Sequence, residues 1–205
     1  MKDQIAIGVL AYNVADYVEE VLSEVQEFKL KVYVIDDSSS DGTTELLGKL
    51  KNKFDFKLKK NLKNSGAGYS TKLLIDEALN DGYKFLIKVD GDGQFEKADI
   101  KKIIDLYKKD NYNFIKSNRF WNGGIKGKIP KKRLFGNLFA TILLQIVTGT
   151  NKLYDPLNGL FGVSTGIAKD LDKYYPKRYG YPFYITAVSV MNELKTFQIN
   201  NVVKY

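Results

Sequence analysis

The sequence predicts an α/β fold, in which a mostly parallel, Rossmann-like sheet carries helices on both of its faces. Short apolar runs alternate along the first half of the chain with stretches whose apolar residues recur at helical spacing. Strands and helices that alternate in this way are typical of a parallel, doubly wound sheet. The chain of 205 residues, 44% of them apolar and 27% charged, is also long enough to form one globular domain over residues 1–205.

The elements of the first half are placed by their apolar spacing and by the turns between them. Each strand is a short apolar run, and each helix starts after a polar or glycine-containing turn. In chain order we expect strand 5–10, helix 14–28, strand 31–36, a helix capped by Asp41 and ending at Leu50, strand 54–60, turn 64–68, a helix to Leu79, strand 83–90 and helix 98–108.

The second half of the chain is less regular. We expect a strand at 113–117, a basic, glycine-containing loop over 119–133, an apolar helix over 134–149, a helix around 183–194 and a closing strand near 197–205. Packing in the core is the commonest role for a helix with as little charge as 134–149. This helix is too short to span a bilayer, but it could instead lie at a membrane face, with the preceding basic residues against anionic headgroups.

Composition narrows the chemistry. Cysteine and histidine are both absent, which excludes thiol and imidazole nucleophiles, imidazole bases, thiolate zinc sites and disulfides. A catalytic metal ion must then be held by oxygen, which favours Mg²⁺ or Mn²⁺. The net charge of +8 suits phosphorylated ligands, an anionic membrane or nucleic acid, but no nucleic-acid-binding module accompanies it, so we expect no nucleic-acid partner. The missing cysteine and the charged N-terminus favour the cytoplasm.

The segment 90-DGDGQF-95 follows a predicted strand and is the strongest chemical signal. Carboxylates two residues apart on an irregular turn, Asp90 and Asp92, can converge on one divalent ion that bridges the phosphates of a nucleoside diphosphate. A solvated acidic turn is the alternative, since Asp and Gly are common turn formers. An EF-hand calcium loop is excluded, because Lys101 stands where the loop requires Glu.

Further polar turns follow the first three predicted strands, at the sheet edge where ligands of such folds bind. Ala11, Tyr12 and Asn13 follow the first strand. Asp36 and Asp37 end the second, and two adjacent acids after a buried strand repel each other unless something uses them, so we expect at least one to contact a nucleotide. For Asp41 the capping role is expected. Gly66 and Gly68 allow either a close approach to a ligand or a sharp turn into a helix.

This order of motifs resembles glycosyltransferase family 2 with the GT-A fold. The family opens with the motif P-x-Y-N-E, and this chain has its Tyr and Asn as Tyr12 and Asn13 but lacks the Pro and Glu. The family motif V-D-D-G-S-x-D-G-T corresponds to 35-IDDSSSDGT-43, in which Ser38 replaces the first Gly. The motif N-x-G-x-G is matched by Asn64, Gly66 and Gly68, and the motif D-x-D-x-Q by Asp90, Asp92 and Gln94.

Within the family, the chain looks most like the dolichyl- or polyprenyl-phosphate sugar transferases. That subgroup's S-R-[FY] element is matched by 118-NRF-120, its later Arg at the start of an amphipathic helix by Arg133 with Asn137, and its D-x-x-[SN]-G-[LF] turn by 155-DPLNGLFG-162. The resemblance implies that Asp90, Asp92 and Gln94 hold the metal, that Arg119 and Arg133 bind phosphates and act with Asp92 in catalysis, and that the nucleotide contacts Ala11, Tyr12, Asn13, Asp36, Asp37, Gly66 and Asp90.

We therefore expect an inverting transferase that uses a GDP- or UDP-linked sugar and Mg²⁺ or Mn²⁺. Polyprenyl or dolichyl phosphate is the expected acceptor, because a phosphate is already ionised and needs no general base. The alternatives are a glycan hydroxyl as acceptor in cell-surface polysaccharide synthesis, and a non-catalytic nucleotide-sugar-binding protein. A nucleotidyltransferase is disfavoured, since 8-GVLAYN-13 lacks a G-x-G-T-R-like loop. We expect the enzyme at the cytoplasmic face of a membrane, either peripheral or lacking the C-terminal anchor that many relatives carry.

Overall fold

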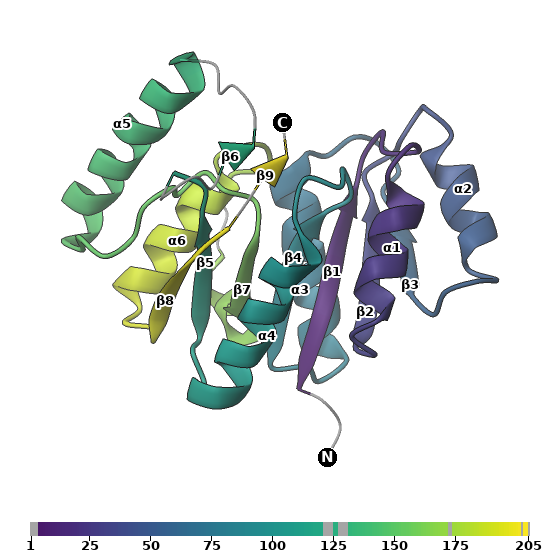
Figure 1. Ribbon diagram of the computed structural model, residues 1–205, viewed down its shortest axis with the longest axis horizontal. Helices are drawn as coiled ribbons and strands as arrows, with labels where there is room; N and C mark the ends of the chain where they lie inside the picture. The colour runs from purple at the N-terminus through teal and green to yellow at the C-terminus, as the bar shows by residue number, and fades with distance from the viewer. Residues whose placement is uncertain (1–3, 121–124, 127–130, 172–173, 202, 205) are drawn as a thin grey trace.

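A computed structural model of the chain describes residues 4–120, 125–126, 131–171, 174–201 and 203–204. A seven-stranded sheet in the order β3-β2-β1-β4-β7-β5-β8 forms its centre (Figure 1). The strands of this sheet are β1 (Ile5–Ala11), β2 (Lys31–Asp36), β3 (Lys57–Lys60), β4 (Phe85–Asp90), β5 (Phe114–Asn118), β7 (Phe161–Ser164) and β8 (Thr196–Asn200), and a separate pair joins β6 (Ile125–Lys126) to β9 (Val203–Lys204). The helices are α1 (Val18–Gln26), α2 (Thr43–Leu50), α3 (Ala67–Asn80), α4 (Lys97–Asp110), α5 (Lys131–Thr148), the 3₁₀ helix η1 (Thr165–Asp170) and α6 (Tyr181–Met191).

The sheet is mostly parallel, as predicted. The pairs β3–β2, β2–β1, β1–β4 and β5–β8 are parallel, and β7 runs antiparallel between β4 and β5. Strand β7 was not predicted, since it has only four residues. Its Gly162 is required by packing, because a Cβ there would lie 2.5 Å from the ring of Phe85.

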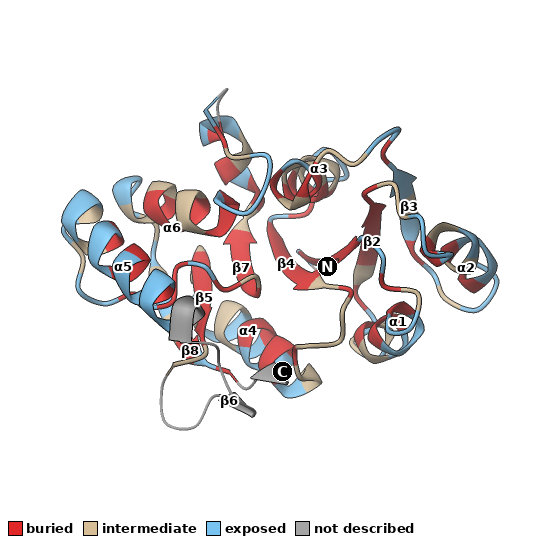
Figure 2. Ribbon diagram, turned by 90° about the horizontal axis from the view of Figure 1, so that it is seen from above, coloured by how far each residue is buried: buried red, intermediate tan, exposed pale blue. Residues whose placement is uncertain are grey.

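Helices cover both faces of the sheet (Figure 2). Alternate residues of a strand point to opposite faces, so Ile7 of β1 faces the core under α1 and α4, and Leu10 faces the core under α3 and α6. Both cores are made of buried aliphatic and aromatic side chains. This architecture confirms the predicted fold class.

Helix α5 corrects one expectation, that of a core helix. It packs on α6 through a narrow stripe that includes Ala140 and Leu144, and its remaining large apolar side chains are exposed. The reason is that α6 already covers this part of the sheet, so α5 lies outside it (Figure 2). Among the described residues, no helix combines the length and apolar character that crossing a bilayer requires.

The register of the central strands assembles the site. Ala11 at the end of β1 pairs with Asp36 at the end of β2, and Leu10 pairs with Asp90 at the end of β4. The amides of Asp37 and Gly91 donate to the carbonyls of Ala11 (2.9 Å) and Leu10 (2.8 Å), which keeps the three turns side by side. The predicted motifs therefore meet at one sheet edge.

Candidate active site

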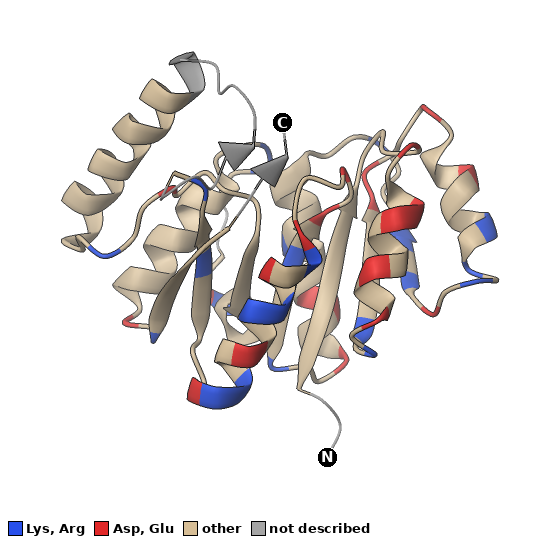
Figure 3. Ribbon diagram, viewed as in Figure 1, with Lys and Arg blue, Asp and Glu red and all other residues tan. Residues whose placement is uncertain are grey.

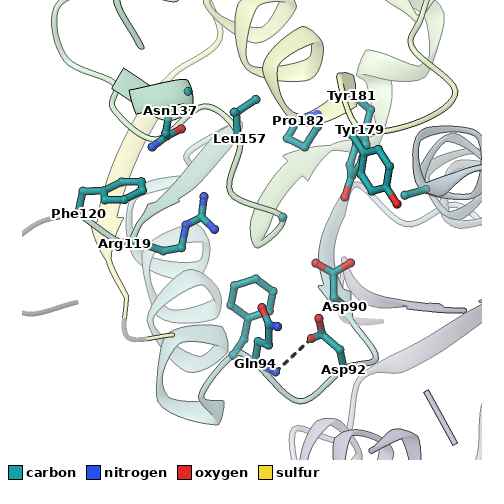
Figure 4. A pocket seen from close by; sticks show the side chains of 14 residues that line it. Asp90, Asp92, Gln94, Arg119, Phe120, Asn137, Leu157, Tyr179, Tyr181 and Pro182 are labelled. Atoms are coloured by element: carbon teal, nitrogen blue, oxygen red, sulfur yellow. Dashed lines mark hydrogen bonds between the residues drawn. The ribbon is translucent and has the colours of Figure 1, made fainter. Parts of the chain in front are cut away.

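A cavity of about 450 Å³, here called the acidic pocket, opens at the carboxyl end of β4. Three walls form it (Figure 4). Its lining residues are Asp90, Asp92, Gln94 and Phe95 beyond β4, Arg119, Phe120, Gly136, Asn137, Leu157 and Gly159 on one side, and Ala67, Tyr179, Tyr181 and Pro182 on the other. Three of the predicted site residues, Asp90, Asp92 and Gln94, thus share one pocket with a fourth, Arg119.

Asp90 is held by a buried lysine that the sequence motifs did not reveal. Lys88 lies two residues earlier on β4, so its side chain points to the same face of the sheet. Its fully buried Nζ forms an ion pair with Oδ1 of Asp90 and donates a hydrogen bond of 2.7 Å to the hydroxyl of Tyr181. Burial alone lowers the pKa of a lysine, but the Asp90 carboxylate outweighs it, and the pKa of Lys88 lies above its ordinary value. The pair therefore orients Asp90.

Gly159 leaves room for the other oxygen of Asp90. A Cβ on Gly159 would lie 2.3 Å from Oδ2 of Asp90 and 3.3 Å from Nζ of Lys88. The turn 155–160 therefore passes close over the carboxylate, and a side chain at position 159 would displace it. This gives a physical reason for glycine in the segment 155-DPLNGLFG-162.

Asp92 lies beside Asp90 and forms no ion pair with a basic residue in the described part of the chain. Its Oδ1 accepts a hydrogen bond of 3.1 Å from the amide of Gln94 (Figure 4). Burial raises the pKa of Asp92, and the negative charge of Asp90 raises it further. A cation placed between the two carboxylates would offset both the burial of the Asp92 charge and its repulsion by Asp90.

The residues of the acidic pocket fit a divalent cation that is shared with a phosphorylated ligand. Within the described residues, no group of three or more acidic, His or Cys side chains could enclose a metal ion by itself. Mg²⁺ in nucleotide sites is commonly held by one or two carboxylates together with substrate phosphates and water. The pair Asp90 and Asp92 matches that arrangement, and the predicted role of Gln94 as a further ligand stays a prediction.

A second, smaller cavity of about 140 Å³, here called the side cavity, adjoins the acidic pocket, since Ala67 and Tyr179 line both. The side cavity is lined by Leu10, Tyr12, Asp37, Asn64, Gly66, Ala67, Arg178 and Tyr179. Oδ1 of Asn64 is buried and has no hydrogen-bond partner among the described residues. This oxygen is available to accept a hydrogen bond from a ligand in the cavity.

The adjacent acids Asp36 and Asp37 are both buried, and both are used within the protein. Asp37 accepts hydrogen bonds from the amides of Ser65 (2.9 Å) and Gly66 (2.7 Å), so it shapes the glycine-rich turn. Asp36 accepts from the amide of Ser39 at 3.0 Å and from the hydroxyl of Thr44. These bonds within the protein explain why two carboxylates stand in succession, and no ligand is needed for that explanation. Nucleotide contact by either residue stays a prediction.

The turn after β1 is divided between structural and exposed residues. Ala11 is buried, and Asn13 accepts a hydrogen bond of 2.9 Å from the amide of Ser40. Tyr12 is 46% exposed and lines the side cavity. The N-cap of α2 is Gly42 and not Asp41 as expected. Asp41 lies one residue before it and accepts a hydrogen bond of 3.0 Å from the amide of Thr43, the first residue of α2.

The two glycines of the turn 64–68 bring a distant segment to the site. A Cβ added to Gly66 would lie 2.4 Å from the carbonyl oxygen of Lys177. A Cβ added to Gly68 would lie 1.9 Å from the carbonyl oxygen of Pro176. The amide of Tyr69 donates to the carbonyl of Lys177 at 3.0 Å. Segment 176–182 is thereby fixed against α3, where it supplies Arg178 and the tyrosines at 179 and 181. The sequence motifs did not single out these residues.

Arg119 is fixed by an ion pair across the pocket wall. Its Nε and Nη2 each donate at 2.8 Å to the fully buried carboxylate of Asp155, and its backbone amide donates to the same group at 2.9 Å. Nearby, Asn137 of α5 is 4% exposed, and its Oδ1 has no hydrogen-bond partner among the described residues. The side chain of Arg133, the other predicted phosphate ligand, lies outside the described residues.

Sequence comparison finds a matching family model and several relatives. The model described as glycosyl transferase family 2 matches residues 6–174. The UDP-N-acetylglucosamine–dolichyl-phosphate N-acetylglucosaminyltransferase of Methanococcus voltae is 26% identical over 187 residues, covering 82% of this chain and 73% of that protein. An uncharacterised protein of Methanocaldococcus jannaschii is 28% identical over 139 residues, which are 66% of this chain and 58% of the relative. The chain thus spans only part of its relatives' length.

Solved structures share the fold. Glucosyl-3-phosphoglycerate synthase of Mycobacterium tuberculosis, in complex with Mn²⁺ and UDP-glucose, superposes with a TM-score of 0.71 at 15% identity, covering 97% of this chain and 70% of the other. TarS 1–349 of S. aureus, in complex with UDP-GlcNAc, gives a TM-score of 0.65 at 20% identity and covers 100% of this chain and 58% of the other. At these identities the likeness concerns the fold.

Proposed function

Because the chain belongs to glycosyl transferase family 2, we propose that it transfers a sugar from a UDP-linked donor to a polyprenyl or dolichyl phosphate. The observation that carries this proposal is the acidic pocket, in which Asp90 and Asp92 face Arg119 and Asn137 across one cavity. Acidic groups for a metal–diphosphate and basic or amide groups for a second phosphate therefore line opposite sides (Figure 4).

The donor is proposed to lie across the two cavities. The base enters the side cavity, where Tyr12 offers a ring face and Oδ1 of Asn64 offers an acceptor for a base N–H. The diphosphate then lies toward Asp90 and Asp92, where Mg²⁺ or Mn²⁺ would supply charge neutralisation for the leaving group. A uracil base is proposed because the Methanococcus voltae relative is named for a UDP-sugar and the structural neighbours were solved with UDP or UDP-sugars.

The acceptor phosphate is proposed to bind at Arg119 and Asn137. Asp155 holds the guanidinium in place through Nε and Nη2, so the group loses little conformational freedom on meeting a phosphate. The buried amide of Asn137 has one end without a partner, and rotating it by 180° about its axis presents the NH₂ group to a phosphate oxygen. The name of the Methanococcus voltae relative includes a dolichyl-phosphate acceptor, which supports the same choice.

A phosphate nucleophile also fits the acids of the pocket. A hydroxyl acceptor needs a base to take its proton, whereas an ionised phosphate does not. Among the described residues that line the acidic pocket, the carboxylates are Asp90 and Asp92, and both are assigned to the metal–diphosphate. In the proposed single displacement, an oxygen of the acceptor phosphate bonds to the anomeric carbon, and the bond from that carbon to the nucleoside diphosphate breaks. The diphosphate leaves with the electron pair, and the anomeric configuration inverts.

The test is transfer of labelled sugar to lipid. The protein is incubated with Mn²⁺, a panel of labelled UDP- and GDP-sugars and a short polyprenyl phosphate, and the label extracted into organic solvent is counted. We expect lipid-linked label with a UDP-sugar, and its loss in Asp92→Ala but not in Asp105→Ala, an exposed acid of α4 outside the pocket. Absence of lipid-linked label with every donor would overturn the proposal, and so would label that appears only in parallel incubations with glycan acceptors.

A further inference from the structure

The exposed side of α5 is an unusual surface for a protein in water. Leu134, Phe135, Leu138, Phe139, Ile142, Leu143, Ile146 and Val147 are between 40% and 74% exposed, and together they are here called the outer face of α5. They recur in pairs every four residues, so they form one stripe along the helix. Contiguous apolar patches of this kind usually mark a binding surface.

Charge is distributed in a way that complements this stripe. Residues 111–154, which include α5, contain eight Lys or Arg and no Asp or Glu, whereas the whole chain has 32 basic and 24 acidic residues. The remainder of the chain therefore has 24 of each and is neutral. The entire net charge of +8 lies in the segment that carries the outer face. Four of these basic residues, Lys128, Lys131, Lys132 and Arg133, directly precede the stripe in sequence.

We propose that the outer face of α5 docks on an anionic lipid surface, with the helix lying in the plane of the interface. A helix with aliphatic and phenylalanine side chains on one side and lysines beside it inserts its apolar face at the level of the headgroups. Each Lys or Arg near such a surface adds attraction to anionic lipids. Figure 3 shows no acidic residue along α5 that would oppose this attraction.

A lipid surface fits this face better than a protein does. The outer face consists of Leu, Phe, Ile and Val and has no Tyr, Trp or Arg, the residues that dominate the energetics of protein interfaces. Acyl chains need no hydrogen-bond partners, and the outer face offers none. A second copy of the chain is disfavoured as occupant, because pairing the two outer faces would bring two segments with a charge of +8 together.

The same helix reaches the acidic pocket. Gly136 and Asn137, on the first turns of α5, line the pocket between the outer face and Arg119. Docking would therefore hold the acceptor side of the pocket beside the headgroups, where the phosphate of a lipid-linked acceptor lies. This placement of the acceptor rests on the proposed function, whereas docking itself does not.

The test is binding to vesicles of phosphatidylcholine with and without phosphatidylglycerol, measured by co-sedimentation. We expect the protein to bind the anionic vesicles and to be released by salt. Phe139→Ser with Ile146→Ser should weaken binding by about a hundredfold, since each lost apolar side chain is worth about tenfold. Lys131→Gln with Lys132→Gln should weaken binding to the vesicles that contain phosphatidylglycerol and leave binding to pure phosphatidylcholine unchanged. The matched control, Leu62→Ser with Met191→Ser, changes two exposed apolar residues outside the outer face and should bind as the parent does.

Three outcomes would overturn the docking proposal. They are no binding of the parent protein to anionic vesicles, equal binding by the Phe139→Ser/Ile146→Ser variant, and a concentration-dependent dimer in solution that this variant abolishes. The donor-induced rise in melting temperature is measured on the same samples. A variant that no longer binds vesicles but keeps this rise in melting temperature separates docking from donor binding. Vesicle binding without any sugar transfer to lipid would contradict the proposed function and leave the docking proposal intact.

Discussion

Replacing Gly159 with Ala tests whether the position of the Asp90 carboxylate controls the reaction. The new Cβ would lie 2.3 Å from Oδ2 of Asp90, and ordinary van der Waals contact begins at 3.4 Å, so a shortfall of about 1 Å must be relieved by movement. The backbone of Gly159 does not require glycine, because its φ is not in the left-handed region. Lys88 holds Oδ1, so either the carboxylate turns on that ion pair or the turn 155–160 withdraws.

A displacement of about 1 Å in a positioned catalytic group costs about a hundredfold in rate, which corresponds to about 3 kcal/mol of transition-state stabilisation. We therefore expect kcat/KM for sugar transfer to fall by about that factor, with a smaller metal-dependent thermal shift by the donor. Gly136→Ala is the matched control, because Gly136 lines the same pocket and its added Cβ meets no described atom within 4 Å. Parent-like transfer and thermal shift in Gly159→Ala would refute the role given to Asp90.

Three further predictions concern the metal, the donor loop and a buried lysine. Asp92→Ala should abolish the Mn²⁺-dependent part of the thermal shift given by a UDP-sugar, and a full shift would contradict the site. Gly68→Ala places its Cβ 1.9 Å from the Pro176 carbonyl oxygen and should weaken donor binding in calorimetry, whereas Gly48→Ala, which meets no described atom within 4 Å, should not. Burial lowers the pKa of Lys116 from 10.5 to about 7, so between these values the unfolded chain binds more protons and stability rises with pH. Between pH 7 and pH 9, the free energy of unfolding measured by urea denaturation should rise by about 2 kcal/mol more in the parent than in Lys116→Met. An equal rise in the two proteins would argue against the shifted pKa.

The strands were predictable from the sequence where apolar residues dominate a short run. Strands β1, β2 and β4 are covered by helices on both faces, so their sequences are mostly apolar and stand out. Strand β7 has four residues, FGVS, and its place between β4 and β5 depends on pairing with segments more than 40 residues away in sequence. The exposure of α5 was not predictable either, because an apolar helix has the same sequence whether it packs in a core or docks on a lipid surface.

The site was predictable to the extent that its geometry is local. Asp90 and Asp92 are two residues apart at a strand end, and the structure places them in one pocket. Other contacts that shape the pocket join residues that are distant in sequence. The hydroxyl of Tyr181 meets Lys88 across 93 residues, and Asp155 meets Arg119 across 36. Such pairs leave no spacing pattern in a single sequence.

The partner of Asp90 also determines how strongly the site attracts a cation. With the Lys88 ammonium included, Asp90 and Asp92 give a local charge of about −1, because the ion pair cancels one carboxylate. A divalent ion brought in alone would leave the pocket with an excess positive charge, whereas a divalent ion that arrives with a diphosphate restores a charge of about −1. The repulsion that raises the pKa of Asp92 is relieved in the second case without a new imbalance. Under the proposed function, Lys88 would thus favour uptake of the metal together with the donor, and it would keep the metal from being held tightly after the nucleoside diphosphate departs.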